Sequence, residues 1–576
     1  MKKQWKVKNF DAKILPNLPQ YPNLILKLLS LRGIASEEGI GDFLDPDFNK
    51  LHDPFLFKQM QTAVTRIWKA IEYEEKITIF ADYDADAITA CAVLYLALRK
   101  LGAKADYYIP DRFTEGYGLN QEAIKSIAEK TRNEDAEKRG LIITVDCGMN
   151  AVDEAELAAA CGVDLIITDH HELTGKLPRV LAIINPKNPN DEYPFLYLTG
   201  VGVAFKLVQA LFTAPRLASA RSGQPAAAGW EKWLLDLVAL GTVADCQSLT
   251  SENRILVSFG LKVLAKTKWP GLKALLATAQ VRSDKYDAFT LGFILAPRIN
   301  AAGRIKHADI AFKLLISGSP DEAEGLAGQL NDLNKHRQML TEQITSEARS
   351  QIELISDKKV LLAVGQDWPK GVVGLVAGRL AEEYNRPVVA LSTVDGVATG
   401  SGRSVIDFDL VAALNFSKDF LQKYGGHTQA AGFTLAHDNI PGFHQKLLEY
   451  ADLKEMPISD PVLEIDAEAE VSDITWDNLN YLERFGPFGF GNSKPKFVGR
   501  GMEVLDSRLV GATGQHLKLR VRFGVHMLEA IAFGQGFFGG SLVPGKKIDV
   551  VFELAANEWN GNKQMQLKIL DIKLNE

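Results

Sequence analysis

The stretch "KITIFADYDADAITACAVLYLALRKLGA" (residues 76–103) decides the fold of this 576-residue chain. It starts with a short β-branched run, passes through three aspartates at alternate positions, and continues with helical spacing up to a glycine. The design then recurs, because "LIITV" (141–145) precedes the helix-like "AVDEAELAAACG" (151–162) and "DLIIT" (164–168) follows. Strands that alternate with helices of this length predict βαβ units and a parallel sheet, hence an α/β fold.

Acidic and histidine side chains follow each of these three apolar runs. The carboxyl ends of parallel strands lie along one edge of a sheet, where α/β proteins bind ligands, so we expect these side chains to lie close together. If the first segment stays extended, alternate side chains share a face and its three aspartates converge. The side chains concerned are Asp82, Asp84, Asp86, Asp146, Asp169, His170 and His171.

A metal site explains this set better than separate local roles do. A single aspartate after a strand usually caps the next helix, and a lone histidine pair is more often a hydrogen-bonded turn than a ligand set. So many carboxylates at one edge, with Asp245 of "GTVADC" (241–246) as a further member, would repel one another unless cations neutralised them. Mixed carboxylate and imidazole ligands suit Mn²⁺ or Mg²⁺. Two such ions about 3.5–4 Å apart are typical of phosphoester hydrolysis.

The composition narrows the class of protein. The chain is too long for one hydrophobic core. Its net charge of −7 is not typical of a nucleic-acid-binding protein, although a cleft or a bound metal can make the local electrostatic potential positive. The N-terminus lacks the apolar segment of a secretory signal, and no apolar run is long enough to span a bilayer. The four cysteines are far apart, which disfavours zinc ribbons and disulfides and fits a reducing cytoplasm.

The rest of the chain predicts further domains. A long polar helix over 320–356 is typical of a helix that bridges domains. A second α/β region follows at 358–455, and the last 115 or so residues alternate like the strands of a small barrel, closed by a hairpin at 557–567. The Ala/Ser/Pro/Gly-rich stretch at 213–229 predicts a surface insertion.

The ordered motifs "DYDADA", "VDCG", "DHH" and "GTVAD" resemble those of the DHH phosphoesterase superfamily. Several further stretches resemble the RecJ family within it, namely "IPDRFTEGYGL" (109–119), "APRINAAGR" (296–304), "LNDLNKHRQ" (330–338), "GSGRS" (400–404), "GGHTQAAGF" (425–433) and "FGPFGFGNSKPKF" (485–497). The resemblance implies an N-terminal extension (1–75) packed on a DHH catalytic domain (76–319), a connecting helix (320–356), a DHHA1 domain (357–456) and an OB-fold (457–576).

The resemblance also implies site residues. Asp169 would orient the histidines, and His171 would lie beside the attacking water or the scissile phosphate. The chain departs from the family pattern at Ala87, Pro369 and Ser493, none of which is an expected ligand. The implied ligands of two Mn²⁺ or Mg²⁺ ions are Asp82, Asp84, Asp86, Asp146, His170 and Asp245.

The substrate would meet cationic and aromatic groups. "GSGRS" reads as a Gly-rich turn that holds a phosphate, or equally as a surface turn with an exposed arginine. An aromatic beside cations suits a single strand, although a lone arginine or tyrosine in a loop is usually only a surface group. The candidate substrate-binding residues are Arg112, Tyr117, Arg298, Asn300, Arg304, Ser401, Arg403 and His427.

Three functions remain open from the sequence. The resemblance implies a 5′→3′ exonuclease that acts on single-stranded DNA with a 5′ phosphate, in DNA repair and recombination. It also implies a cytoplasmic monomer whose partners are single-strand binding protein and a RecQ-type helicase. A phosphoesterase acting on short oligonucleotides (nanoRNA) or cyclic dinucleotides is the enzymatic alternative. The third hypothesis is a non-catalytic replication protein that has kept the fold and lost metal ligands, yet every expected ligand is present here.

Overall fold

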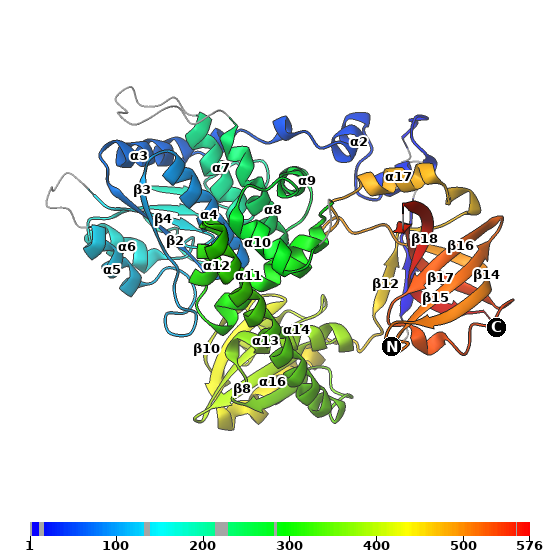
Figure 1. Cartoon of the computed structure of the whole chain (residues 1–576). Helices are drawn as coiled ribbons and strands as arrows, with labels where there is room; N and C mark the ends of the chain where they lie inside the picture. The colour runs from blue at the N-terminus through cyan, green and yellow to red at the C-terminus, as the bar shows by residue number, and fades with distance from the viewer. Residues whose placement is uncertain are drawn as a thin grey trace. The chain divides into compact units, whose positions relative to one another are not determined.

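A computed structural model describes residues 3–10, 16–131, 139–213, 229–281, 285–559 and 561–575, so most of the predicted insertion at 213–229 lies outside it. The chain forms two compact units, His52–Ser459 and the combination of Met1–Leu51 with Asp460–Glu576 (Figure 1). Within the described residues, no helix is both long and apolar enough to cross a membrane.

A five-stranded parallel sheet forms the centre of the first half of the larger unit, as the sequence predicts. Its strands pair in the order β3-β2-β4-β5-β6. Three of them end at the same level, because Ala81 pairs with Val145 and Val145 pairs with Thr168. The strands are β2 (Lys76–Ala81), β3 (Lys104–Tyr108), β4 (Leu141–Val145), β5 (Asp164–Thr168) and β6 (Ala182–Ile184).

Helices cover both faces of this sheet (Figure 1). One face packs on α5 (Gln121–Thr131) and α6 (Val152–Ala160), whose alanines and isoleucines share a core with β4 and β5. The other face packs on α4 (Ala85–Lys100) and α7 (Gly200–Thr213). Further helices of this half include α3 (Met60–Glu72), α8 (Leu235–Ala244), α9 (Ser251–Leu264), α10 (Pro270–Thr278), the π-helical turn η5 (Thr290–Leu295), α11 (Ala296–Ile305) and α12 (Asp309–Ile316).

The 34-residue helix α13 (Pro320–Glu353) joins the two halves of the larger unit, as its polar composition predicts. It packs against α10 and α11 on one side, and against α14 (Lys370–Tyr384) and β7 (Leu361–Gln366) on the other. Ser319 caps its first turn by accepting a hydrogen bond from the Glu322 N–H.

The second half is a five-stranded mixed sheet in the order β10-β11-β9-β8-β7. The "GSGRS" segment, which the sequence predicts to be a turn, is strand up to Arg403, because Gly400 to Arg403 pair with both neighbouring strands. The other elements are β8 (Val388–Val394), β9 (Val397–Arg403), α15 (Leu410–Phe416), β10 (Leu421–His427), β11 (Ala430–Ala436) and α16 (Ile440–Leu453).

A closed barrel occupies the C-terminal part of the chain and confirms the predicted OB-fold. Its strands pair in the order β14-β15-β16-β18-β17, and the pairing of β14 with β17 closes it. The predicted hairpin is present, with Trp559 opposite Asn562, although Asn560 of its Asn-Gly turn lies outside the described residues. The strands are β14 (Phe497–Val510), β15 (His516–Phe523), β16 (His526–Ala532), β17 (Lys547–Trp559) and β18 (Asn562–Leu574), and the helix α17 (Trp476–Arg484) precedes them.

The N-terminal segment corrects part of the prediction that residues 1–75 pack on the catalytic domain, because residues 1–51 form one unit with the C-terminal part and only residues 52–75 belong to the larger unit. Helices α1 (Asn23–Ser30) and α2 (Glu37–Leu44) share one hydrophobic core with the barrel strands. The strand β1 (Gln4–Val7) pairs in parallel with β12 (Val462–Ile465). The reason is hydrophobic burial, because α1 presents five apolar side chains that the barrel core encloses. The chain joins the larger unit from His52 onward.

The burial of α1 gives a first prediction. Leu28→Ala removes a fully buried side chain from the barrel core and should lower the stability of the barrel unit by about 2–5 kcal/mol. Amide hydrogen exchange should then speed up in β15 and β16 but not in β2, β4 and β5. The exposed Glu38→Ala on α2 is the matched control and should change neither. Faster exchange in the parallel sheet would mean that this helix supports the catalytic unit after all.

Candidate metal centre and active-site cavity

The register of the parallel sheet brings three acidic side chains to one level. Asp82, Asp146 and Asp169 each follow the last residue of a strand, and those last residues pair with one another. All three are buried, with Asp82 only 2% and Asp146 only 3% exposed. The structure therefore gathers these carboxylates at the sheet's carboxyl edge, where the sequence predicts them.

Asp84 and Asp86 arrive by a different route from the extended segment predicted for them. The helix α4 begins at Ala85, so Asp84 is its N-cap and accepts hydrogen bonds from the N–H groups of Asp86 and Ala87. Asp86 lies in the first turn, where its carboxylate accepts from the Gly200 and Val201 N–H groups at 2.6 and 2.9 Å. The positive N-terminus of α7 thus fixes the Asp86 carboxylate.

One unusual backbone conformation and one close approach hold this arrangement. Asp146 has a φ of +60°, a left-handed conformation that costs a non-glycine residue roughly 1–3 kcal/mol and is typical of functional sites. A Cβ on Gly200 would lie 2.4 Å from the Asp146 Cβ, so only glycine permits α7 to start there. Asp146 is therefore held by the fold and does not cap α6, whose N-cap is Ala151.

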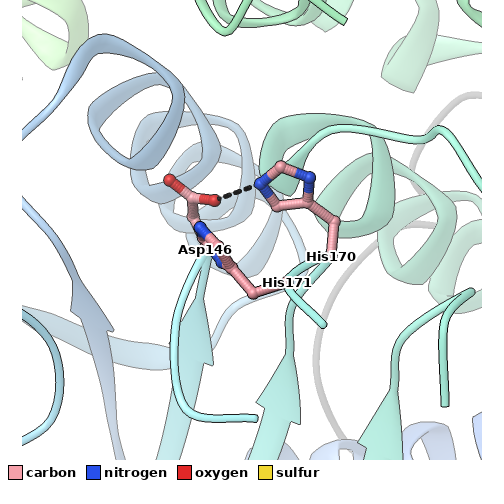
Figure 2. Close-up of side chains that lie close together, drawn as sticks. All are labelled: Asp146, His170 and His171. Carbon is pink, nitrogen blue, oxygen red and sulfur yellow. Dashed lines mark ion pairs between the residues drawn. The ribbon is translucent and has the colours of Figure 1, made fainter. Parts of the chain in front are cut away.

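His170 lies between the acids from several elements. Its Nε2 is 3.0 Å from an oxygen of Asp146 and 3.8 Å from an oxygen of Asp245, the residue that ends α8. Figure 2 shows the Asp146 carboxylate facing the His170 ring. Two adjacent ligands of an octahedral ion at 2.0–2.1 Å lie about 3 Å apart, so this spacing suits a shared cation.

The Asp169 carboxylate makes contacts with both histidines. One of its oxygens accepts from the His170 and His171 N–H groups and lies 2.7 Å from the His171 Nδ1, and the other accepts from the Met149 N–H. Because both oxygens are used in this way, Asp169 fixes the orientation of His171. The His171 Nε2 lies 3.3 Å from the Tyr117 hydroxyl.

The electrostatics of the site are those of crowded anions. Burial, and after it the neighbouring carboxylates, raises the pKa of Asp86 and Asp146 well above the usual value, that of Asp82 to about 8 and that of Asp245 to about 7. Burial lowers the pKa of His170 to about 3, so its ring is neutral and suited to metal ligation. These shifts predict a cluster that holds protons until cations replace them.

Unpaired buried atoms support the same interpretation. Among the described residues, an oxygen of Asp82, an oxygen of Asp245 and the Nδ1 of His170 are buried without a hydrogen-bond partner. Such atoms are costly unless something satisfies them. Two ligand groups have donor atoms within 4.8 Å of one another, and these are Asp146, His170 and His171, and Asp86, His170 and Asp245.

A cavity of about 930 Å³ opens beside the cluster, between the two halves of the larger unit. The parallel-sheet half contributes Tyr117, Asp169 and His171, and the mixed-sheet half contributes His427 with neighbouring residues of β10 and β11. The volume lies within the range of small-ligand sites. The site therefore combines a metal-ligand cluster with space for a substrate.

The other predicted substrate residues make internal contacts and do not line this cavity. Asn300 accepts from the Ala85 N–H at 2.8 Å and so supports the start of α4. Arg304 donates to the Gly371 carbonyl and joins α11 to α14. Arg403 donates to the Ser401 hydroxyl at 2.8 Å. Arg112 lies over the Tyr83 ring, 4.9 Å from its centroid, and Arg298 donates to the Ile294 carbonyl.

Some contributors to the site were not predicted. The Gly200 and Val201 N–H groups hold Asp86, the Met149 N–H holds Asp169, and Tyr83 lines the cavity beneath Arg112. The first of these had a sequence signal, because a glycine pair that opens a helix ("TGVG") is typical of anion-binding helix N-termini. The Met149 contact had none, since a backbone donor is independent of residue type.

Comparison with known protein families matches the three parts of the chain. The DHH family N-terminal domain matches residues 76–242, the DHHA1 domain residues 357–452 and the RecJ OB domain residues 465–571. The single-stranded-DNA-specific exonuclease RecJ of Bacillus subtilis (strain 168) is 39% identical over 100% of this chain and 71% of its own length. That of Escherichia coli (strain K12) is 33% identical over 99% and 100%.

A solved structure agrees with these sequence matches. The crystal structure of RecJ from Thermus thermophilus in complex with Mn²⁺ superposes with a TM-score of 0.81 and 28% identity, covering 100% of this chain and 80% of that one. The fold, the order of the domains and the full-length identity agree. The chain belongs to the RecJ family of single-stranded-DNA-specific exonucleases.

Proposed function

We propose that the protein is a metal-dependent exonuclease that hydrolyses single-stranded DNA in the 5′→3′ direction to mononucleotides, in DNA repair and recombination. The observation that carries the proposal is the convergence of Asp82, Asp146, His170 and Asp245 at one sheet edge beside an open cavity. The names of the relatives, which specify single-stranded DNA, support the choice of substrate. The proposed domains are those expected from the sequence, except that residues 1–51 belong with the OB-fold.

The residues present fit two Mn²⁺ or Mg²⁺ ions. His170 lies close to both groups of candidate ligands and would bind one of the two ions, and Asp82 and Asp84 would complete the ligand set. When bound, such ions lower the pKa of water and stabilise charge on the attacking and leaving oxygens. Crystal structures of RecJ from Thermus thermophilus with either ion support this choice.

His171 and Asp169 would act together on the substrate. The His171 ring faces the cavity and Tyr117, while Asp169 fixes its other nitrogen. Burial opposes protonation, but the hydrogen bond with Asp169 raises the pKa of His171 above its usual value. A protonated His171 would donate a hydrogen bond to a phosphate oxygen.

The 5′ end would be held by the mixed-sheet half, with Arg403, Ser401 and His427 near its phosphate. An unpaired strand alone could pass between the two halves, which would exclude duplex DNA by shape. We propose that the protein acts as a cytoplasmic monomer, and that a RecQ-type helicase supplies unpaired strands coated by single-strand binding protein. The family resemblance supports these partners, and co-purification from a lysate with and without nuclease treatment tests them.

End-labelled oligonucleotides test the function. With Mn²⁺, a single strand of a few tens of nucleotides labelled at the 5′ end should release labelled mononucleotide at once, whereas a 3′ label should stay on shortening strands. Asp146→Asn should lower kcat by about 10³-fold or more, because it removes a ligand charge while asparagine tolerates a positive φ. Strand binding should remain. Cleavage confined to di- and trinucleotides would favour the nanoRNA alternative, and full activity of Asp146→Asn would refute the ligand assignment.

The buried carboxylates give a stability prediction in EDTA. The pKa of Asp82 is about 8 in the folded protein and near 3.8 in the unfolded chain, so between these pH values the folded state holds a proton that the unfolded state has lost. Stability therefore falls as pH rises. Asp82→Asn escapes this loss, so its stability relative to the natural sequence should increase by about 2 kcal/mol from pH 6 to 8.

Urea unfolding at the two pH values measures this difference. Added Mn²⁺ should stabilise the natural sequence more than Asp82→Asn. Asp571→Asn, at a carboxylate in the barrel unit that accepts from the Trp5 indole, is the control and should not reproduce the Mn²⁺ effect. A pH-independent difference between Asp82→Asn and the natural sequence would contradict the raised pKa.

Arg403→Ala tests the 5′-phosphate role. Its guanidinium has no carboxylate within 4.0 Å among the described residues, so it is available to a phosphate. KM should rise about tenfold or more on a 5′-phosphorylated strand and much less on a 5′-hydroxyl strand. Arg379→Ala, at a surface arginine paired with Glu342, is the matched control. Equal losses on the two strands would rule out this role.

A further inference from the structure

Two phenylalanines on the larger unit are exposed to solvent as a stacked pair. Phe289 is 59% and Phe293 is 73% exposed. Their rings lie 4.9 Å apart between centroids with an interplanar angle of 16°. Single exposed apolar side chains are ordinary, but a parallel aromatic pair that presents its faces to water is a candidate binding surface.

The backbone holds this pair outward. Phe293 lies in the π-helical turn η5, a rare conformation that is frequent at functional sites. Pro297 follows in the first turn of α11, and a proline ring clashes with the carbonyl four residues earlier, here that of Phe293, which favours the wider turn. The Thr290 N–H and hydroxyl both donate to Asp287, which fixes the start of η5.

The turn that carries Phe293 packs against α8, the helix that ends at Asp245. A Cβ on Gly292, in the same turn, would lie 3.1 Å from a methyl of Val243. Val243 is in the last turn of α8, two residues before the expected ligand Asp245. Of the residues that the structure describes, none from α8 or η5 lines the cavity that holds Tyr117 and His171. Contacts of the phenylalanines with a strand would therefore be additional to those made inside the cavity.

Several arginines that form no ion pair within the described part of the chain lie between the site and the two phenylalanines. Arg298 donates to the Ile294 carbonyl at 2.6 Å, directly beside Phe293, and Arg337 of α13 donates to Asn334. Burial lowers the pKa of Arg304 to about 10, and the charges of three neighbouring arginines contribute to this shift. Five arginines of this region have no carboxylate within 4.0 Å among the described residues. They are Arg112, Arg298, Arg304, Arg337 and Arg403.

We propose that Phe289 and Phe293 are a base-stacking platform for the unpaired nucleotides on the 3′ side of the scissile bond. Arg304, Arg337 and Arg298 would lie along the phosphates that lead there. This inference rests on the proposed function and adds a second region of strand contact to it. Stacking accepts any base, because every base has a π-face, but it requires a base that is not paired in a duplex. The platform would therefore add to the selection of single strands.

Length-dependent kinetics test the platform. In Phe289→Leu/Phe293→Leu the apolar surface remains and the aromatic faces are lost. With Mn²⁺, its KM on a strand of about 20 nucleotides should rise about tenfold, since stacking contributes roughly 1–3 kcal/mol per base. KM on a trinucleotide, which is too short to reach the platform, should change by less than about twofold. Phe289→Tyr/Phe293→Tyr retains the π-faces and should restore the natural KM on the long strand.

Strand binding in EDTA decides the matter without turnover. Fluorescence anisotropy with a labelled strand of about 20 nucleotides measures the dissociation constant. This constant should be about tenfold higher for the leucine variant than for the natural sequence, and unchanged for the tyrosine variant. Equal binding by all three proteins would overturn the platform, as would equal losses on short and long strands. A changed molecular mass of the leucine variant with unchanged strand binding would identify a protein–protein contact instead. Strand binding without hydrolysis by the natural sequence would count against the proposed function alone.

Discussion

The crowding of buried carboxylates at one edge of a parallel sheet is the constraint on which the catalytic unit depends. The strand register places Asp82 and Asp146 at one level, and each is nearly without solvent. Like charges in such surroundings are unfavourable, so the fold supplies opposing features, namely the N-terminus of α7 for Asp86 and glycines where helices must approach. Gly241 is one of these, because a Cβ there would lie 2.2 Å from the Thr89 hydroxyl. The repulsion between carboxylates that these features do not offset favours the binding of cations.

Much of this site could be predicted because its cause is local. Short β-branched runs followed by acids define strand ends, and the parallel arrangement then brings those ends together. The route of Asp84 and Asp86 was wrong in detail, since a helix that begins at Ala85 has a different side-chain direction from an extended segment. The site survives this error because the N-cap and the first turn also point toward the sheet edge.

The features that could not be predicted depend on long-range packing. Asn300 accepts a hydrogen bond from the Ala85 N–H and Arg304 donates to the Gly371 carbonyl, and no local sequence pattern reveals these contacts with α4 and α14. The amphipathic helix α1 has an apolar face that would suit any core, and only the folded chain shows that its partner is the barrel. The "GSGRS" segment is strand because both neighbouring strands pair with it, which overrides the turn preference of its glycines.

The shared core of the N-terminal helices and the barrel has a consequence for biosynthesis. Residues 1–51 leave the ribosome well before their packing partners, which begin at residue 460. At a synthesis rate of about 5–20 residues per second, the intervening segment delays that partner by roughly 20–80 s. During this interval the leucine-rich face of α1 has no native surface to cover it, and exposed apolar surface of this kind favours aggregation. A split version that supplies residues 1–51 and 460–576 as one continuous chain would remove the delay.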